Sequence, residues 1–192
     1  MSELPSEIVA PLQPREVRVC TIGTGDSATV RATTRTIISS LIGTAPNDVE
    51  LFNTPKGKPM LRNDPGLHCS ISHSHDVSMI AVTRVAAVGV DIEQLRVVPN
   101  AEAILRRFFT HEAIEEILSD DRRDLRFIEA WTRAEARVKA RGASVWEAAM
   151  PDADTLVRQL SAPDGFAAAV AVRAESWEVV QHDIANADVV MP

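Results

Sequence analysis

The chain has 192 residues, of which 45% are hydrophobic and 24% are charged, with a formal net charge of −7. This length and composition predict one or two domains with a substantial apolar core, and they exclude disordered, collagen-like and coiled-coil proteins. The negative charge argues against a nucleic acid or an anionic membrane as partner, and two cysteines far apart exclude a disulfide framework. Apolar stretches are much shorter than the ~18 residues of a membrane span, and residues 1–15 lack the apolar core of a signal peptide, so we expect a cytoplasmic protein.

Basic residues gather in one part of the chain. Residues 122–141 contain seven basic and three acidic side chains, whereas residues 147–192 contain two basic and eight acidic ones. A local cationic site on an acidic body suits a small phosphorylated ligand better than a polymer.

Apolar periodicity predicts the helices and strands. Glu16 to Ile22 alternates and predicts a strand, and Ser27 caps a helix that Gly43 ends. The other expected elements are a strand over 49–53, a loop over 55–59, strands over 67–72, 77–83 and 87–93, helices over 101–108, 112–118 and 125–140, and strands over 155–160, 166–173 and 177–182. The order of strands, a helix and further strands occurs twice along the chain. This repetition predicts an α+β protein of two similarly built halves, residues 1–84 and 85–192.

The sharpest local signal is the segment from Gly89 to Glu93 at the end of a predicted strand. Because side chains alternate along a strand, Asp91 and Glu93 project from the same face. Two carboxylates so placed can share a hard cation such as Mg²⁺, which prefers oxygen ligands. The same pattern also fits an amphipathic strand whose acids are only solvated.

The helix predicted over 125–140 carries a second candidate group. Phe127, Trp131 and Val138 fall on one face, which we expect to lie in the core. Glu135 and Lys139 are four residues apart and point the same way. They form either a surface ion pair or the carboxylate and cation of a metal and phosphate site.

Two shorter segments are candidates for phosphate binding. Ser72 and His73 stand near a strand end, where a histidine beside small hydroxyls can donate to phosphate; a surface loop is the alternative, and the local spacing of histidines and Cys69 matches no established zinc site. The turn Gly57-Lys58-Pro59 offers a cation, or is simply a charged turn.

Taken together, these segments resemble three ordered motifs of the 4′-phosphopantetheinyl transferases, in particular the larger, internally duplicated type that activates peptide and polyketide synthetases in secondary metabolite biosynthesis. The first motif is Gly57-Lys58-Pro59. The second is Cys69-Ser70-Ile71-Ser72-His73-Ser74 with Gly89-Val90-Asp91-Ile92-Glu93, and the third is Trp131-Thr132-Arg133-Ala134-Glu135-Ala136-Arg137-Val138-Lys139. Their order and spacing agree with the family from about residue 27 to residue 142.

The resemblance implies a fold and a reaction. The fold is two α+β halves related by a pseudo-twofold axis in a monomer, with the active site in the cleft between them. Residues 1–84 are expected to face the nucleotide of coenzyme A, and residues 85–192 to carry the metal and the catalytic helix. The implied reaction transfers the 4′-phosphopantetheine arm of coenzyme A to a serine of an apo acyl or peptidyl carrier protein and releases adenosine 3′,5′-bisphosphate.

The resemblance also implies roles for single residues. Mg²⁺ is expected to bind Asp91, Glu93 and Glu135, and Glu135, directly or through a metal-bound water, is also the expected base for the serine proton. Coenzyme A is expected to contact Lys58, Pro59, Ser72, His73, Lys139, Arg31, Arg35 and Arg133. Of these, His73 and Lys139 serve the reacting pyrophosphate, Lys58 serves phosphate on the nucleotide side, and Arg31 and Arg35 are candidates for the 3′-phosphate.

One departure from the family pattern bears on function. Ala134 stands where the family usually has a lysine, which removes a cation expected near the phosphates, and the neighbouring Arg133 is a candidate substitute. Three other functions stay open: a homologue that binds coenzyme A or a carrier without efficient transfer, a metal-dependent phosphatase, and a structural domain.

Overall fold

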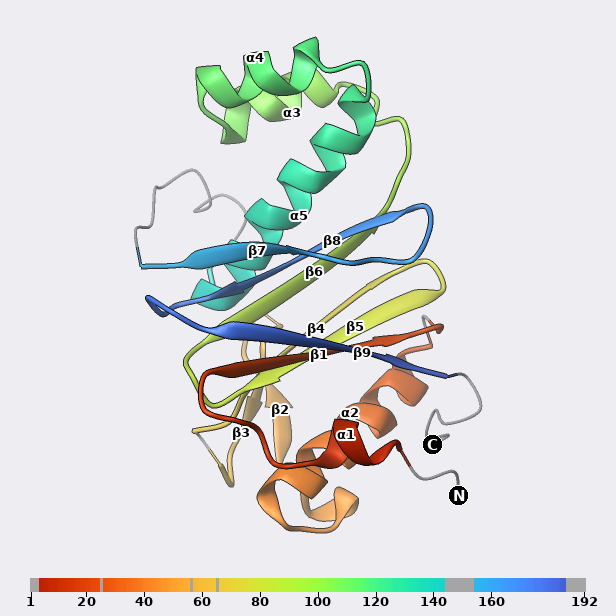
Figure 1. Cartoon of the computed structure of the whole chain (residues 1–192), viewed down its shortest axis with the longest axis vertical. Coiled ribbons are helices and arrows are strands. Elements are labelled where there is room, and N and C mark those ends of the chain that lie inside the picture. The colour runs from red at the N-terminus through yellow and green to blue at the C-terminus, as the bar shows by residue number, and fades with distance from the viewer. Residues whose placement is uncertain (1–3, 25, 56, 65, 144–153, 186–192) are drawn as a thin grey trace.

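Two sheets form the centre of the molecule in the computed structural model, which describes residues 4–24, 26–55, 57–64, 66–143 and 154–185 (Figure 1). The first sheet has the strand order β4 (His68–Ser74), β5 (Val77–Thr83), β1 (Glu16–Ile22) and β9 (Glu178–Ile184). The second has the order β6 (Val88–Gln94), β8 (Phe166–Val172) and β7 (Leu156–Leu160). Neighbouring strands are antiparallel except β1 and β9, which run parallel.

An apolar core lies between the two sheets, because alternate residues of each strand point toward the opposite sheet. Val19 of β1, Met79 of β5, Val90 of β6 and Val170 of β8 are fully buried members of this core. All seven residues of β1 and all seven of β5 are buried, since helices or loops cover the face that does not meet the second sheet.

Helices cover the outer faces of both sheets, so the layers follow the order helix, sheet, sheet, helix. The first sheet carries α2 (Ser27–Ile42), whose buried Ile37 and Ile38 belong to the core on that side. The second sheet carries α5 (Arg123–Arg141), whose Ala136 and Ala140 pack against alanines of β8. These small side chains let the α5 backbone approach the sheet closely.

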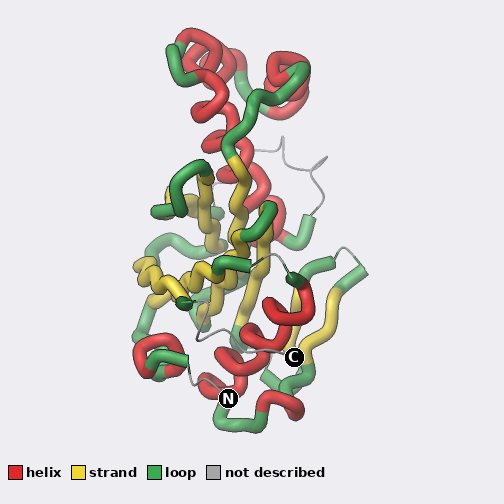
Figure 2. Tube along the Cα trace, turned by 90° about the vertical axis from the view of Figure 1, so that its right-hand side faces the viewer, coloured by secondary structure: helices red, strands yellow, loops and turns green. Residues whose placement is uncertain are grey.

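Two further helices extend the molecule beyond α5. The segments α3 (Ala101–Phe108) and α4 (His111–Ser119) share a small core with the first turns of α5. Figure 2 shows helices at both ends of the molecule, with the strands between them. At the end opposite α3 and α4 lie α1 (Ser6–Val9), η1 (Pro46–Asp48) and a small antiparallel pair of β2 (Leu51–Asn53) and β3 (Pro59–Leu61).

The two sheets repeat one topology. In each, a strand leads through a helix to an antiparallel pair, and the last strand of that pair returns to lie between the other two: β1, α2, β4, β5 in the first half and β6, α5, β7, β8 in the second. The α+β fold class is therefore confirmed. The division at residue 84 and the pseudo-twofold relation stay predictions, and β9, from the second half of the chain, lies in the first sheet beside β1.

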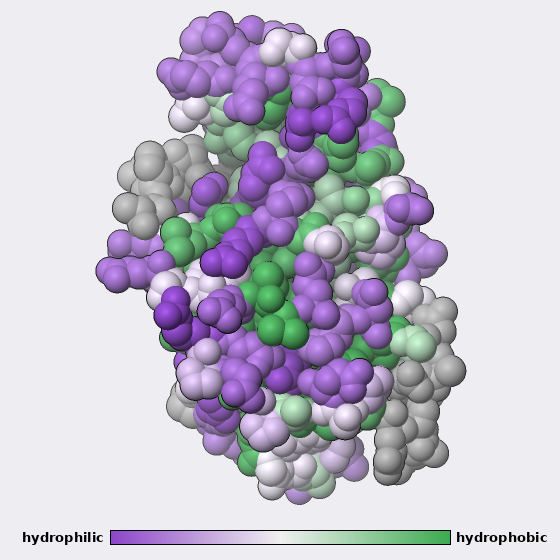
Figure 3. Space-filling view, in the orientation of Figure 1, coloured by the Kyte–Doolittle hydropathy of each residue, from purple (hydrophilic) through white to green (hydrophobic). Residues whose placement is uncertain are grey.

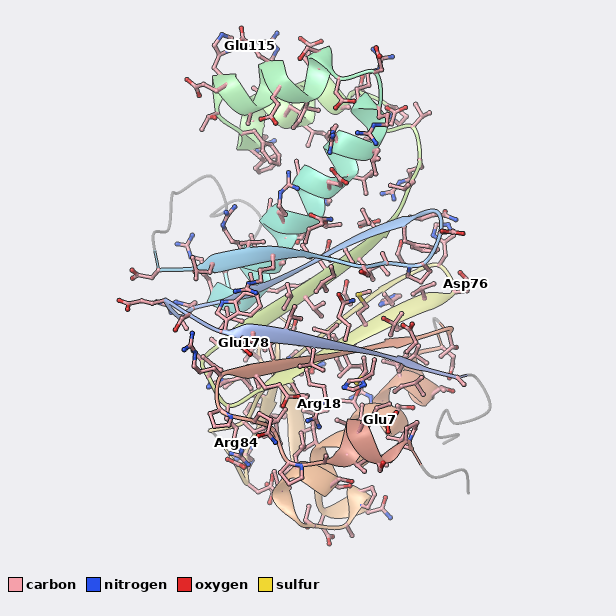
Figure 4. The ribbon with its side chains drawn as sticks, in the orientation of Figure 1. Glu7, Arg18, Asp76, Arg84, Glu115 and Glu178 are labelled. Atoms are coloured by element: carbon pink, nitrogen blue, oxygen red, sulfur yellow. The ribbon has the colours of Figure 1, made fainter. Side chains whose placement is uncertain are left out.

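A buried arginine ties α1 to the first sheet. Arg18 points from β1 toward α1 (Figure 4), where its guanidinium donates to the Ile8 carbonyl at 2.8 Å and the Ala10 carbonyl at 2.6 Å. Glu16 lies 2.8 Å away and balances the charge. A buried arginine is stable only with its donors paired, so this network fixes the path of the chain into β1.

The sequence predicted most elements within two residues, and the details that it missed are short or local. Asp26, not Ser27, caps α2, because its carboxylate accepts the Thr29 N–H at 2.8 Å. Pro59 begins strand β3 although it was assigned to a loop; the proline needs no partner for its nitrogen at this position. The short helices α1 and η1 were not predicted.

Within the described residues, no helix is long and apolar enough to cross a membrane. In Figure 3, polar side chains cover most of the upper end of the face in view, and apolar ones gather in the middle, at the level of the two sheets.

Candidate active site

The candidate site lies along a seam between the two sheets. Strands β4 and β6 are edge strands that run side by side, and serine hydroxyls of β4 rather than its carbonyls accept the N–H groups of β6. Ser70, Ser72 and Ser74 accept from Val90, Ile92 and Gln94 at 3.1, 3.4 and 3.1 Å. We call this set the serine seam. It puts one carboxylate of β6 beside each of the last two serines.

The central serine brings Asp91 and Lys139 together. Ser72 Oγ donates to Asp91 Oδ1 at 2.9 Å, and Lys139 Nζ donates to Ser72 Oγ at 2.8 Å and to Asp91 Oδ1 at 2.7 Å. With the Ile92 N–H as a second donor to its oxygen, Ser72 has used its whole hydrogen-bonding capacity. Its expected contact with coenzyme A is therefore less favoured than a role in positioning Asp91 and Lys139.

Asp91 is almost completely buried, with a side-chain exposure of 6%, whereas that of Lys139 is 30%. Burial raises the pKa of Asp91, and the Lys139 ammonium and the Ser72 hydroxyl offset this only in part. Its second oxygen, Oδ2, is buried with no hydrogen-bond partner among the described residues. An acceptor in that state lacks a cation or donor.

The other two expected metal ligands lie near Asp91 without converging on it. Glu93 accepts from Ser74 Oγ at 3.4 Å and from Arg96 at 2.9 Å. Burial, and after it the negative charge of Asp91, raise the pKa of Glu135, while Lys139 acts in the opposite direction. Among the residues that the structure describes, no three histidine, cysteine or acidic side chains are grouped closely enough to hold a metal ion. The metal-ligand roles therefore stay predictions.

A glycine sets the distance between α5 and β6. A Cβ at position 89 would lie 2.1 Å from the Ala136 carbonyl oxygen, 2.4 Å from the Ala140 nitrogen and 2.8 Å from the Lys139 Cβ. Only the absence of a side chain lets the helix backbone come this close. Gly89 thus allows Lys139, one helical turn after Glu135, to reach Asp91.

Two adjoining pockets lie beside this group. The larger, of about 260 Å³, is lined by Arg31 of α2, His73 of β4 and residues of the Gly57–Pro59 turn. The smaller, of about 110 Å³, shares Gly57, Pro59 and Ile71 with the larger and reaches Lys139. Alternation along β4 places Ser72 on the seam and exposed His73 on the pocket side, as its sequence pattern indicates. The pair of pockets suits an elongated ligand that runs from Arg31 to Lys139.

Lys58 lines the smaller pocket and not the larger one. Its ammonium donates to the carbonyls of Lys139 at 2.7 Å, Ala140 at 3.0 Å and Val88 at 3.2 Å, which accounts for all three of its N–H groups. Burial lowers the pKa of Lys58. These contacts do not favour the expected bond from Lys58 to a phosphate.

Two expected contributors to phosphate binding lie elsewhere. Arg35 donates to the Val49 carbonyl and thereby fastens α2 to the segment before β2. Arg133 donates to Gln159 of β7 at 3.2 Å and lines a different cavity, of about 350 Å³, between α4 and α5. The structure therefore does not place Arg133 where a lysine at position 134 was expected to act.

Sequence reasoning missed the parts of the site that depend on contact between the halves. Alternation placed Ser74 on the same strand face as Ser72, whereas Ser70, at the same spacing of two, was noted only as a motif residue. The bonds from these hydroxyls to β6 were not predicted. Gly89 was noted as a motif residue, but nothing local in the sequence indicates that the backbone of α5 packs against it.

Comparisons with known proteins identify the family of this chain. A profile of the 4′-phosphopantetheinyl transferase superfamily matches residues 87–186, slightly more than half of the chain, and the chain belongs to this superfamily. The matched part contains β6 and α5, which carry Asp91, Glu93, Glu135 and Lys139.

Several named proteins are similar to the chain. The 4′-phosphopantetheinyl transferase HetI of Nostoc sp. is 32% identical over 117 residues, which cover 58% of this chain and 49% of HetI. The 4′-phosphopantetheinyl transferase psf-1 of Bacillus pumilus is 35% identical over 103 residues, or 52% of this chain and 43% of psf-1. The 4′-phosphopantetheinyl transferase AcpT of Salmonella typhi is 31% identical over 129 residues, or 66% of this chain and 65% of AcpT. The chain thus spans about half the length of the first two relatives.

Proposed function

We propose that this protein transfers the 4′-phosphopantetheine arm of coenzyme A to a serine of an apo acyl or peptidyl carrier protein, releasing adenosine 3′,5′-bisphosphate. We further propose the larger, duplicated type, a cytoplasmic monomer in which the two halves are related by a pseudo-twofold axis. Support comes from the superfamily membership and from the repeated order of strand, helix and two strands. Coenzyme A then lies in the paired pockets, between Arg31 and Lys139.

The donor set of the site suits Mg²⁺. Asp91 has a buried oxygen without a partner among the described residues, and burial, with a smaller contribution from neighbouring carboxylates, raises the pKa of both Asp91 and Glu135. Asp91, Glu93 and Glu135 are the residues that would hold the ion. When bound, it would neutralise the charge that develops on the pyrophosphate oxygens.

The chain's own side chains then divide the remaining work. Lys139, which uses two N–H groups on Ser72 and Asp91, has a third for a phosphate oxygen, and His73 can donate to the same pyrophosphate from the pocket side. Arg31 suits the 3′-phosphate at the other end of the pocket. Glu135 accepts the proton of the carrier serine. At the same time the serine oxygen bonds to phosphorus, and the bond from that phosphorus to the departing nucleotide phosphate breaks.

The observation that carries the proposal is the group of Ser72, Asp91 and Lys139, which joins two sheets and a helix within hydrogen-bond distances of 2.7 to 2.9 Å. The test is to incubate the protein with coenzyme A, Mg²⁺ and several apo carrier proteins and to weigh the carriers by mass spectrometry. We expect one carrier to gain the mass of the arm, at a rate that falls when Mg²⁺ is chelated. Unmodified carriers throughout would refute the transferase.

Ala134 supports a second candidate, a homologue that binds coenzyme A or a carrier but transfers the arm poorly. The helix lacks a lysine there, and Arg133, which pairs with Gln159, does not replace it. Calorimetric titration with coenzyme A separates the two candidates. Binding without any modified carrier would favour the second.

A further inference from the structure

We propose that Lys58 is a positioning residue for Lys139, and that its ammonium holds the last turn of α5 against β6 rather than binding a phosphate of coenzyme A. This inference rests on the proposed transferase function. It assigns Lys58 a different role from the one that its motif predicts.

The contacts of the ammonium carry the argument. The last carbonyls of a helix lack partners in a following turn, and α5 ends at Arg141. The Gly142 N–H reaches the Lys139 carbonyl at 3.2 Å, which leaves room for a second donor there and for a donor to the Ala140 carbonyl. Lys58 supplies them at 2.7 and 3.0 Å, and it joins both to the Val88 carbonyl at the start of β6, at 3.2 Å. A positive charge at this end of the helix also complements the helix dipole.

The path of the Lys58 stem supports the same role. Gly142 caps α5 with a φ of 62°, and a Cβ placed there would lie 3.7 Å from Lys58 Cδ. The stem therefore runs directly past the helix end. An ammonium held by three carbonyls has no N–H group left for a phosphate.

The link from Lys58 to chemistry runs through one residue. Lys139 contributes its carbonyl to Lys58 and its side chain to Asp91 and Ser72. Together with the close contact at Gly89, Lys58 fixes the backbone from which the Lys139 ammonium extends. Loss of the bonds to Lys58 frees the last turn and lets that ammonium shift relative to Asp91.

The test compares Lys58→Met, which keeps most of the stem, with two other variants. Arg31→Met removes the proposed 3′-phosphate contact, and Arg62→Met removes an exposed cation just after β3, with 70% of its side chain exposed. Each protein is assayed with coenzyme A and with 3′-dephospho-coenzyme A. We expect Lys58→Met to lower kcat ~10-fold or more with both donors and to change KM little, because a misplaced Lys139 slows the reaction itself. Arg31→Met should raise KM for coenzyme A alone, and Arg62→Met should match the parent.

Two measurements need no transferase activity. Hydrogen exchange should accelerate at residues 138–143 in Lys58→Met while β1 and β5 stay protected, which also shows that the variant is folded. Acylation of Lys139 by an amine reagent, followed by mass spectrometry, should become faster as its bonds to Asp91 and Ser72 weaken. If no protein modifies a carrier, the proposed function fails, and these two readouts still decide the role of Lys58. A rise in the KM of Lys58→Met that disappears with 3′-dephospho-coenzyme A would overturn the inference. So would hydrogen exchange at residues 138–143 and acylation of Lys139 that are unchanged from the parent.

Discussion

Replacing Gly89 with alanine tests whether the close contact of α5 with β6 sets the geometry of the site. The added Cβ would stand 2.1 Å from the Ala136 carbonyl oxygen and 2.4 Å from the Ala140 nitrogen. Carbon and oxygen normally approach no closer than about 3.3 Å, so α5 has to retreat by roughly 1.2 Å. Both atoms belong to the helix backbone, and no change of rotamer can relieve the contact.

Two effects follow from this retreat. Overpacked sites lose ~1–3 kcal/mol of stability, and we expect ~3 kcal/mol here because a whole helix must move. The retreat also carries Lys139 away from Asp91, from which its ammonium is now 2.7 Å distant. A shift of ~1 Å at a catalytic group lowers the rate ~100-fold.

Urea unfolding followed by circular dichroism measures the first effect, and the rate of carrier modification measures the second. Gly66→Ala is the matched control, since its Cβ would meet the Asp64 carboxylate at an ordinary 3.5 Å. We expect that control to stay within ~0.5 kcal/mol of the parent. If Gly89→Ala were equally stable and equally active, the helix would not be held by this contact and the reasoning would be refuted.

Three other substitutions address the charges of the site. Asp91→Asn should abolish transfer at every Mg²⁺ concentration while the thermal midpoint stays near that of the parent, because the amide oxygen can still accept from Ser72 and Lys139; retained activity would exclude Asp91 as a metal ligand. Burial and Asp91 raise the pKa of Glu135 above its ordinary 4.5, so without divalent cations the folded state loses stability as the pH rises above about that value. In Glu135→Gln this loss should be absent. Its free energy of unfolding in urea should exceed that of the parent by ~0.5 kcal/mol at pH 7 and differ little from it at pH 4. The same dependence on pH in both proteins would contradict this origin of the Glu135 pKa shift. Ala134→Lys should raise kcat/KM for coenzyme A ~5- to 30-fold, the effect of ~1–2 kcal/mol from a charged hydrogen bond, whereas Arg133→Ala should leave it unchanged; the reverse pattern would place Arg133 at the phosphates.

Local patterns predicted the elements that local physics determines. Strands β1 and β5 were predicted to the residue, because alternation and β-branched residues mark them and turns bound them. Helices α3 and α5 were predicted within two residues from apolar periodicity, with Gly142 as the end of α5. Strand β3 escaped prediction, since its three residues hold too little pattern and begin with a proline.

The site was predictable in its residue types and less so in its contacts. Alternation correctly placed Asp91 with Glu93 and separated Ser72 from His73. The bond from Lys58 to Lys139 joins residues 81 positions apart, so no local pattern could indicate it. The pairing of β9 with β1 escaped prediction for the same reason, because it depends on how the finished sheets meet.

The serine seam also bears on edge-to-edge association between copies of this protein. An exposed sheet edge is a template on which a strand of another molecule can add. Along β6, alternate N–H groups point to the edge, and serine hydroxyls from β4 occupy them. Replacing these serines with alanine would thus disturb two properties at once. Asp91 and Glu93 would each lose a serine donor, and a row of backbone N–H groups would be left for a strand of another molecule.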